Sequence, residues 1–302
     1  MPPGGATGDI GRIADAGVML SGAYLAMGRV EGCQALSARM LRAAEEVGDE
    51  VIAAMHTLVL GAACYARGDW PCGQDLVRRV KQRFVAGDPS PLTIRVVPGL
   101  ATILTWQGAW EEARSYLETS LETARVMDVA DVERTALAYL AELDVLQGRP
   151  QDAIIRLRPY IASELAWEYA VTFWSALAAA YLELEDLQQA RAAAEQAVAV
   201  ARRSGAWLHG IWALQVHGMV QARCGDHDLA EAAYQEGLER ARAMPFPYGE
   251  ARLLHAHGLL DRQRRNDTAA HARFSDALAI VESLGAERDA IRFREPPDTR
   301  AS

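Results

Sequence analysis

Two histidines at matching positions of the chain are the first candidates for chemistry. His217 and His257 stand 40 residues apart in segments of similar pattern, so a repeating fold would bring them close together. Paired imidazoles can bind a metal ion or respond to pH. No acidic residue or cysteine shares their position in the pattern, and His255 faces another direction on a helix because it lies two residues from His257. We therefore interpret both as packing residues and predict no metal site.

The spacing of other reactive residues does not favour catalysis. Glu142 and Asp144 are two residues apart, as are Glu183 and Glu185, so each pair of carboxylates diverges on a helix. Lys81 is the only lysine, and the chain has no Gly-Lys-Ser or Gly-Lys-Thr of a phosphate-binding loop. No spacing supports a Ser-His-Asp or Cys-His arrangement. We predict that the chain is not an enzyme and uses no cofactor.

A pattern with a period of about 40 residues runs along the chain and must position these side chains. A turn residue recurs at steps of 40, 40, 40, 37, 40 and 40, and a small residue stands seven positions before each turn. Such self-similarity is the signature of stacked repeats. We predict an all-α fold, a right-handed superhelical solenoid of about seven antiparallel helix pairs. The turn residues are Gly28, Gly68, Gly108, Gly148, Glu185, Gly225 and Arg265.

Each repeat is expected to contain a helix A before the turn and a helix B after it. In the fifth repeat, Phe173, Leu177 and Tyr181 form one apolar stripe on helix A, while Ala190 and Ala194 have the same spacing on helix B. A turn glycine adopts a left-handed conformation at little steric cost. The small residues allow helices A and B to approach closely.

Composition and cysteine usage limit the partners and the compartment. The formal net charge is -9 and the sequence pI about 5.3, whereas holding a nucleic acid requires clustered basic residues. The uncharged stretch 51–66 is too short to span a bilayer, and the first residues lack the basic start of a signal peptide. We expect a cytoplasmic protein without nucleic-acid or membrane binding. Its cysteines should be buried or incidental thiols in different repeats: Cys33, Cys64, Cys72 and Cys224.

These columns of residues resemble the tetratricopeptide repeat family, although the repeats are longer than that family's 34 residues. The last repeat contains the strings Pro247-Tyr248-Gly249-Glu250-Ala251-Arg252, Phe274-Ser275-Asp276-Ala277-Leu278 and Leu284-Gly285-Ala286-Glu287. Through these, and through its long repeats over residues 9–292, the chain also resembles the sensor arms of MalT-like ATP-dependent LuxR-type bacterial regulators, most strongly over the last three repeats. The nucleotide-binding and DNA-binding modules of those regulators have no counterpart in this sequence. The fifth repeat matches the repeat pattern best, through Trp174, Leu177, Ala178, Tyr181, Ala190 and Ala197.

The resemblance implies that the A helices line an open concave groove. Trp106 and Trp212 would be aromatic anchors for a ligand. Arg223, Arg252 and Arg262 would receive an anionic group, unless they pair with Glu183 or are only solvated. The candidate groove residues are Tyr65, Arg95, Trp106, Glu142, Trp212, Met219, Arg223, Arg252, His255 and Arg262.

We divide the chain into a flexible leader (1–8), the solenoid (9–292) and a flexible tail (293–302), with a short last helix from Ala286 to Phe293. Pro159 cannot continue helical hydrogen bonding in the fourth helix B. Residues 158–168 therefore form either a seam between repeats 1–4 and 5–7 or a tolerated local deletion.

Taken together, the sequence predicts a non-catalytic binding module. It would be the ligand-sensing or protein-interaction arm of a bacterial transcription-regulatory or signalling system, and would recognise a peptide, a helix or a small effector in the groove. The alternative is a structural adaptor that joins two proteins without a small-molecule effector. The identity of the partner and the oligomeric state stay open.

Overall fold

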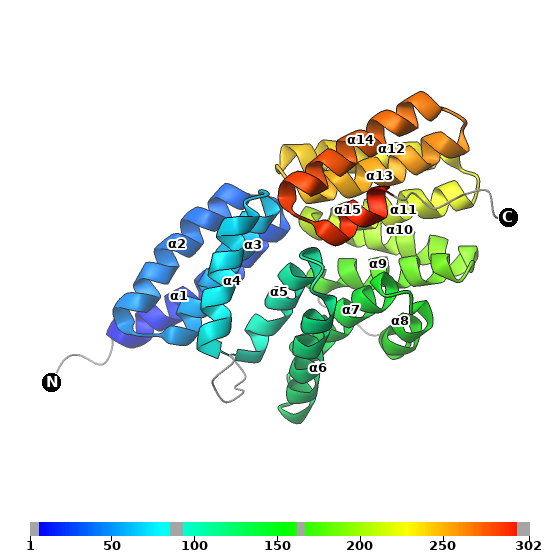
Figure 1. Cartoon of the computed structure of the whole chain (residues 1–302). Coiled ribbons are helices and arrows are strands. Elements are labelled where there is room, and N and C mark those ends of the chain that lie inside the picture. Colours follow the sequence, from blue (N-terminus) through cyan, green and yellow to red (C-terminus); the bar gives the residue numbers. More distant parts are fainter. Residues whose placement is uncertain (1–5, 85–92, 162–166, 295–302) are drawn as a thin grey trace.

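Seven helical hairpins, packed one against the next, make up the architecture (Figure 1). The computed structural model describes residues 6–84, 93–161 and 167–294, and every regular element within these ranges is helical. The predicted all-α solenoid of seven antiparallel helix pairs is thereby confirmed. The A helices are α1 (Ala6–Ala26), α3 (Glu50–Ala66), α5 (Thr93–Trp106), α7 (Ala130–Leu146), α9 (Trp167–Glu183), α11 (Trp207–Arg223) and α13 (Pro247–Gln263). The B helices are α2 (Val30–Val47), α4 (Trp70–Phe84), α6 (Trp110–Val126), α8 (Pro150–Leu157), α10 (Leu187–Ser204), α12 (His227–Ala243) and α14 (Asp267–Leu284), and α15 (Glu287–Arg294) follows as a last short helix.

The turn between helices A and B has the same backbone conformation in every hairpin. All seven predicted turn residues have positive φ, between 71° and 83° for the five glycines and 60° for Glu185 and Arg265. The residue after the turn donates its backbone N–H to the last turn of helix A, as Asp69 does to Cys64 O at 2.9 Å. This bond satisfies a carbonyl that the helix end leaves without a partner. The period of the sequence therefore reflects a left-handed backbone conformation that recurs at every A–B turn.

The small residues seven positions before each turn are buried where helices A and B cross. A Cβ atom at Gly218 would lie 2.3 Å from Tyr234 Cε1, and one at Gly258 would lie 2.6 Å from Phe274 Cε1. Glycine is therefore required in these two hairpins because an aromatic ring of helix B covers the position. The leucine beside this column is buried by the neighbouring hairpins, as for Leu140 at 0% exposure, whereas Leu20 on the first helix is 47% exposed.

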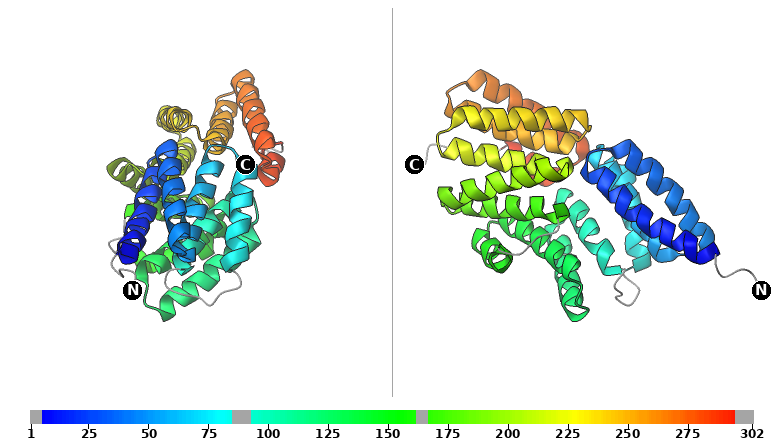
Figure 2. Two further views of the ribbon diagram at one scale, coloured as in Figure 1. Left: turned by 90° about the vertical axis from the view of Figure 1, so that its left-hand side faces the viewer. Right: turned by 180° about the vertical axis from the view of Figure 1, so that it is seen from behind.

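The groove is not open along its length, contrary to our expectation, because the superhelix closes on itself. The turns of the first three hairpins lie against the C-terminal helices, beside Met244, Pro247 and Arg288 respectively. Arg288 Nη2 is 3.4 Å from Glu111 Oε2, and its guanidinium carbon lies 4.4 Å from the centroid of the Trp110 ring. Figures 1 and 2 show the N-terminal hairpins ending beside these helices. Curvature thus brings early and late repeats into contact.

Helix α8 is the irregular element of the stack. It ends at Leu157, and Pro159 lies in a 3-10 turn (Arg158–Tyr160) that follows it, as the missing proline N–H requires. Helix α9 nevertheless packs against both α7 and α8, and one hydrophobic core runs through all three. Residues 162–166 of the predicted seam lie outside the described residues.

The helical part of the chain extends slightly beyond the boundaries that we expected. Helix α1 begins at Ala6, within the expected leader, and α15 ends at Arg294, within the expected tail. Phe293 is buried, so the final helix belongs to the packed structure. Residues 1–5 and 295–302 lie outside the described residues.

Candidate binding site

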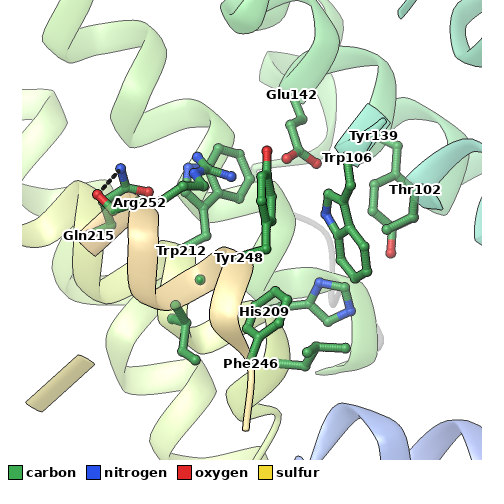
Figure 3. Close-up of a pocket in the computed structure, with 13 residues that line it drawn as sticks. Thr102, Trp106, Tyr139, Glu142, His209, Trp212, Gln215, Phe246, Tyr248 and Arg252 are labelled. Atoms are coloured by element: carbon green, nitrogen blue, oxygen red, sulfur yellow. Dashed lines mark hydrogen bonds between the residues drawn. The ribbon is translucent and has the colours of Figure 1, made fainter. Parts of the chain in front are cut away.

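One pocket on the inner wall gathers side chains from four A helices and the turn before the last of them (Figure 3). We call it the aromatic pocket. Early helices α5 and α7 form one side of it, and late helices α11 and α13 form the other. Closure of the superhelix is what brings the two sides together. Its lining residues are Thr102, Trp106, Tyr139, Glu142, Leu208, His209, Ile211, Trp212, Gln215, Phe246, Tyr248, Gly249 and Arg252.

Aromatic rings join the two sides of the aromatic pocket. The ring centroid of Trp106 on α5 lies 5.7 Å from that of Phe246 and 6.2 Å from that of Tyr248. Tyr248 in turn lies 5.7 Å from Trp70 of the second hairpin. These separations fall in the range in which aromatic pairs attract each other beyond simple area burial. The rings therefore stabilise closure and also provide flat apolar surface for a ligand.

Two opposite charges face the aromatic pocket without forming an ion pair. Glu142 on α7 is 8% exposed, and within the described residues its carboxylate makes no hydrogen bond or salt bridge. Burial raises the pKa of this carboxyl to about 7, and the charge of Arg252 on α13 opposes the rise. The buried Nε of Arg252 has no hydrogen-bond partner among the described atoms. Both side chains thus keep bonding capacity for a ligand.

The remaining polar groups of the aromatic pocket are held by the fold. Tyr248 Oη donates to Asp289 Oδ2 at 2.7 Å, and Gln215 Nε2 donates to the main-chain oxygen of Arg252 at 3.3 Å. Burial lowers the pKa of His209 to about 4, so this imidazole is neutral at pH 7. These contacts orient the first turns of α13 and leave Glu142 and Arg252 as the charged groups of the site.

The space within the aromatic pocket is small. It amounts to about 30 Å³, which suits ordered water or the end of one side chain. Charge pairing and contact with ring faces are the interactions that this lining can make with such a group. The arrangement is suited to recognition of part of a larger partner.

Four of the ten predicted groove residues meet in the aromatic pocket: Trp106, Glu142, Trp212 and Arg252. Trp106 and Trp212 are both half-buried, so each ring presents surface to the pocket while packing against the core. They come from repeats three, four, six and seven, and lie two, six, thirteen and thirteen residues before their turns. The sequence offsets therefore identified members of the site without showing that they converge.

The other predicted groove residues lie elsewhere. Tyr65 is completely buried, packs against Trp70 and accepts a hydrogen bond from Gln107 Nε2. Arg223 forms an ion pair with Glu185, and not with Glu183 as the sequence suggested. The structure therefore does not bring the three predicted arginines together around one anion.

Contacts with neighbouring aromatic rings occupy two more of these candidates. His255 stacks on Phe293 with centroids 4.2 Å apart, and Arg262 lies 4.7 Å from the centroid of Phe274. Met219 is half-buried and packs against the main core. The side chain of Arg95 lies outside the described residues.

Sequence reasoning missed His209, Phe246 and Tyr248. They lie 16 to 19 residues before their turns, close to the start of helix A, whereas the expected offsets reach back 13 residues. The available signal was the aromatic cluster around Pro247 at the start of the last helix A. This cluster becomes part of the pocket only because the superhelix closes, and the repeat period does not predict that closure.

The histidine pair and the thiols take no part in the aromatic pocket. His217 contacts Gln221 with 2.9 Å between Nε2 atoms, and His257 lies 5.4 Å from the Tyr234 ring. No group of three His, Cys, Asp or Glu side chains that could hold a metal occurs in the part of the chain that the structure describes.

The cysteines depart from our expectation in one respect. Cys64 on α3 and Cys72 on α4 belong to the same hairpin, and their sulfur atoms are 2.9 Å apart. The prediction that the cysteines occupy different repeats is therefore wrong. Eight residues separate the two, which is the distance across one A–B turn.

Comparisons with known proteins agree with this architecture. Residues 169–243 match the tetratricopeptide repeat family, and no curated protein matches the sequence. The fold is similar to a Rap protein complexed with competence and sporulation factor, with a TM-score of 0.57, 11% identity, and coverage of 94% of this chain and 96% of that one. It is also similar to the apo form of the quorum sensor NprR from B. thuringiensis, with a TM-score of 0.52, 13% identity, and coverage of 94% and 86%. At these identities the similarity shows the fold alone.

The more specific resemblance to MalT-like sensor arms and the cytoplasmic location stay predictions. Within the described ranges, none of the helices combines the length and the apolar character needed to cross a membrane.

Proposed function

We propose that this chain is a non-catalytic recognition module that binds a segment of a peptide or protein partner at the aromatic pocket. The observation that carries the proposal is the convergence of Trp106, Trp212 and two unpaired charges from opposite sides of the closed superhelix. Buried aromatic anchors beside charged groups are typical of recognition sites. A bacterial signalling or transcription-regulatory role is part of the same proposal.

The proposed mechanism couples binding to closure. A ligand in the aromatic pocket contacts α5 and α7 on one side and α11 and α13 on the other. It therefore binds the closed superhelix more tightly than an opened one, and shifts the population toward closure by that difference in affinity. The partner's signal would be the resulting change in the relative position of early and late hairpins.

The size of the pocket favours a side chain of a larger partner over a fully enclosed small molecule. The free space of about 30 Å³ holds the end of a side chain, so most of a ligand must lie along the inner wall outside it. The two similar structures support a signalling role for this chain, since one is a Rap protein complexed with competence and sporulation factor and the other is a quorum sensor.

Selection from a random 12-residue peptide library displayed on phage tests the proposal. Peptides enriched on the wild-type protein are synthesised, and their affinities are measured by isothermal titration calorimetry. The double variant Trp106→Ala/Trp212→Ala should lose a few kcal/mol of binding free energy, as is usual for buried aromatic anchors. Tyr24→Ala on α1 is the control, because Tyr24 is a half-buried aromatic residue outside the pocket.

Equal binding of the selected peptides to wild type and the double variant would contradict the proposal. Small-angle scattering with a bound peptide then separates a sensor from the alternative, a structural adaptor. The sensor becomes more compact on binding, whereas the adaptor keeps its dimensions.

A further inference from the structure

A buried carboxylate without a partner is the feature of the aromatic pocket that needs a further explanation. Glu142 is 8% exposed, lines the pocket, and makes no hydrogen bond or ion pair with any described residue. Transferring a carboxylate from water to such a site is unfavourable unless a cation or hydrogen-bond donors compensate it. Within the described residues, the charge of Arg252 offsets part of this penalty, and no hydrogen-bond donor contacts the carboxylate.

Arg252 does not serve as the direct partner of Glu142. No guanidinium nitrogen of Arg252 lies within 4.0 Å of a carboxylate oxygen of Glu142, and the guanidinium carbon instead lies 5.8 Å from the centroid of the Tyr248 ring. The two side chains belong to α7 and α13, which approach each other only through closure. A group bound between them would complete the coordination of both.

The aromatic lining determines which sign of charge the pocket accepts. The faces of aromatic rings carry negative partial charge and attract cations. Trp106, Tyr139, Trp212 and Tyr248 surround the space next to Glu142 (Figure 3). An anion would be attracted by Arg252 alone among these groups, whereas a cation is attracted by the rings and by the carboxylate.

The titratable groups that face Glu142 are compatible with a bound cation. On α11, His209 is kept neutral by burial, which lowers the pKa of its imidazole to about 4. Burial raises the pKa of Tyr248 on α13, so its hydroxyl is neutral at pH 7, and α5 contributes Trp106 and Thr102. Arg252 on α13 is the one positive charge among the pocket residues, and its free Nε can donate to a carbonyl oxygen of the same ligand.

We propose that the aromatic pocket receives a positively charged amino group of the bound partner, with Glu142 as its counter-ion and the rings of Trp106 and Trp212 beside it. The inference rests on the proposed recognition function and specifies the chemistry of the ligand. An ammonium group fits the free space of about 30 Å³, because it is about the size of a water molecule. The group can be the N-terminal amine of a peptide or the side-chain amine of a lysine.

Titration with small amines, followed by NMR of the Trp106 and Trp212 indole N–H signals, tests this inference. Nα-acetyl-lysine amide presents a side-chain ammonium, and alaninamide presents an N-terminal ammonium. The neutral counterparts are Nα-acetyl-norleucine amide and N-acetylalaninamide, and the anionic probe is Nα-acetyl-glutamate amide. The amine probes should shift both signals saturably, and the probe that binds more tightly identifies the source of the amine.

The matched variants are Glu142→Gln, which keeps the shape and removes the charge, and Glu122→Gln on the exposed face of α6. Glu142→Gln should weaken amine binding by about tenfold or more, because a buried charge pair then lacks one partner. Glu122→Gln should leave it unchanged. In the wild type, affinity for the lysine probe should rise from pH 6 to pH 8, because burial places the pKa of Glu142 at about 7 while the lysine amine stays charged. Alaninamide is left out of this comparison, because an N-terminal amine loses its own charge near about pH 8.

Three results would overturn the inference: no saturable shift with either amine, equal binding of the neutral or anionic probes, or unchanged binding in Glu142→Gln. The phage-selected peptides separate this failure from failure of the proposed function. If they bind through Trp106 and Trp212 but tolerate acetylation of every amine, recognition stands and the amine inference fails. If amines bind but no peptide is selected, the amine site in the pocket stands and the proposed recognition of peptides fails.

Discussion

Replacing Glu142 with glutamine should stabilise the ligand-free protein at pH 8. Burial raises the pKa of this carboxyl from its ordinary 4.5 to about 7. The folded protein therefore holds the proton more tightly than the unfolded chain, and the stability this contributes is present below pH 4.5 and is lost as pH rises through about 7. The difference between the two pKa values corresponds to about 3 kcal/mol. Glutamine does not ionise, so the variant avoids this loss.

Urea unfolding of wild type and Glu142→Gln at pH 5 and pH 8, followed by circular dichroism, measures the effect. The advantage of the variant should grow by about 2–3 kcal/mol between these pH values. Buried histidines such as His209 and His255 titrate in both proteins, so their contributions cancel in the difference. A difference that stays constant from pH 5 to pH 8 would refute the reasoning, since the carboxylate would then be ionised and compensated throughout.

Three further predictions test the packing of the closed solenoid. Gly68→Ala and Gly48→Ala should each lower the free energy of unfolding by about 1–2 kcal/mol, because both glycines have positive φ. Only Gly68→Ala should also enlarge the radius of gyration in small-angle scattering. Its added Cβ would lie 2.9 Å from Pro247 in the C-terminal half, whereas a Cβ at Gly48 would meet no described atom within 4 Å. Gly218→Ala should lower stability by about 1–3 kcal/mol in urea unfolding through overpacking, and an unchanged midpoint would contradict the close helix crossing. Hydrogen peroxide should oxidise Cys64 and Cys72 to a disulfide, with the peroxide reduced to water. Mass spectrometry should show the loss of two hydrogens in the wild type and no such loss in Cys72→Ser. The disulfide should raise the free energy of unfolding by about 2–3 kcal/mol.

The repeat architecture could be predicted from the sequence because it depends on local constraints with a fixed period. A left-handed turn residue and a small residue at a helix crossing each restrict the amino acids allowed at one position. All seven predicted turn residues accordingly have positive φ, including Glu185 and Arg265, where only the position in the pattern pointed to a turn.

The arrangement of the site could not be predicted in the same way, because it depends on curvature summed over many repeats. Glu142 lies six residues before its turn and Arg252 thirteen residues before its own, so no shared offset relates them. They face one pocket because the superhelix closes, which brings the ends of early A helices to the starts of late ones. Small differences in packing angle at each hairpin decide this, and the sequence pattern does not display them.

The cysteine pair, by contrast, is predictable from the repeat pattern. Cys64 and Cys72 lie on either side of the turn at Gly68, which places them on the two helices of one hairpin. Their sulfur contact then follows from the antiparallel crossing of α3 and α4.

Nuclear Overhauser effects between aromatic rings show whether early and late hairpins close around one pocket. With selectively labelled aromatic residues, the indole protons of Trp106 should show cross-peaks to the ring protons of Phe246 and Tyr248, whose centroids lie 5.7 and 6.2 Å away. Cross-peaks from Trp106 only to residues of its own and adjacent hairpins would contradict closure and, with it, the pocket.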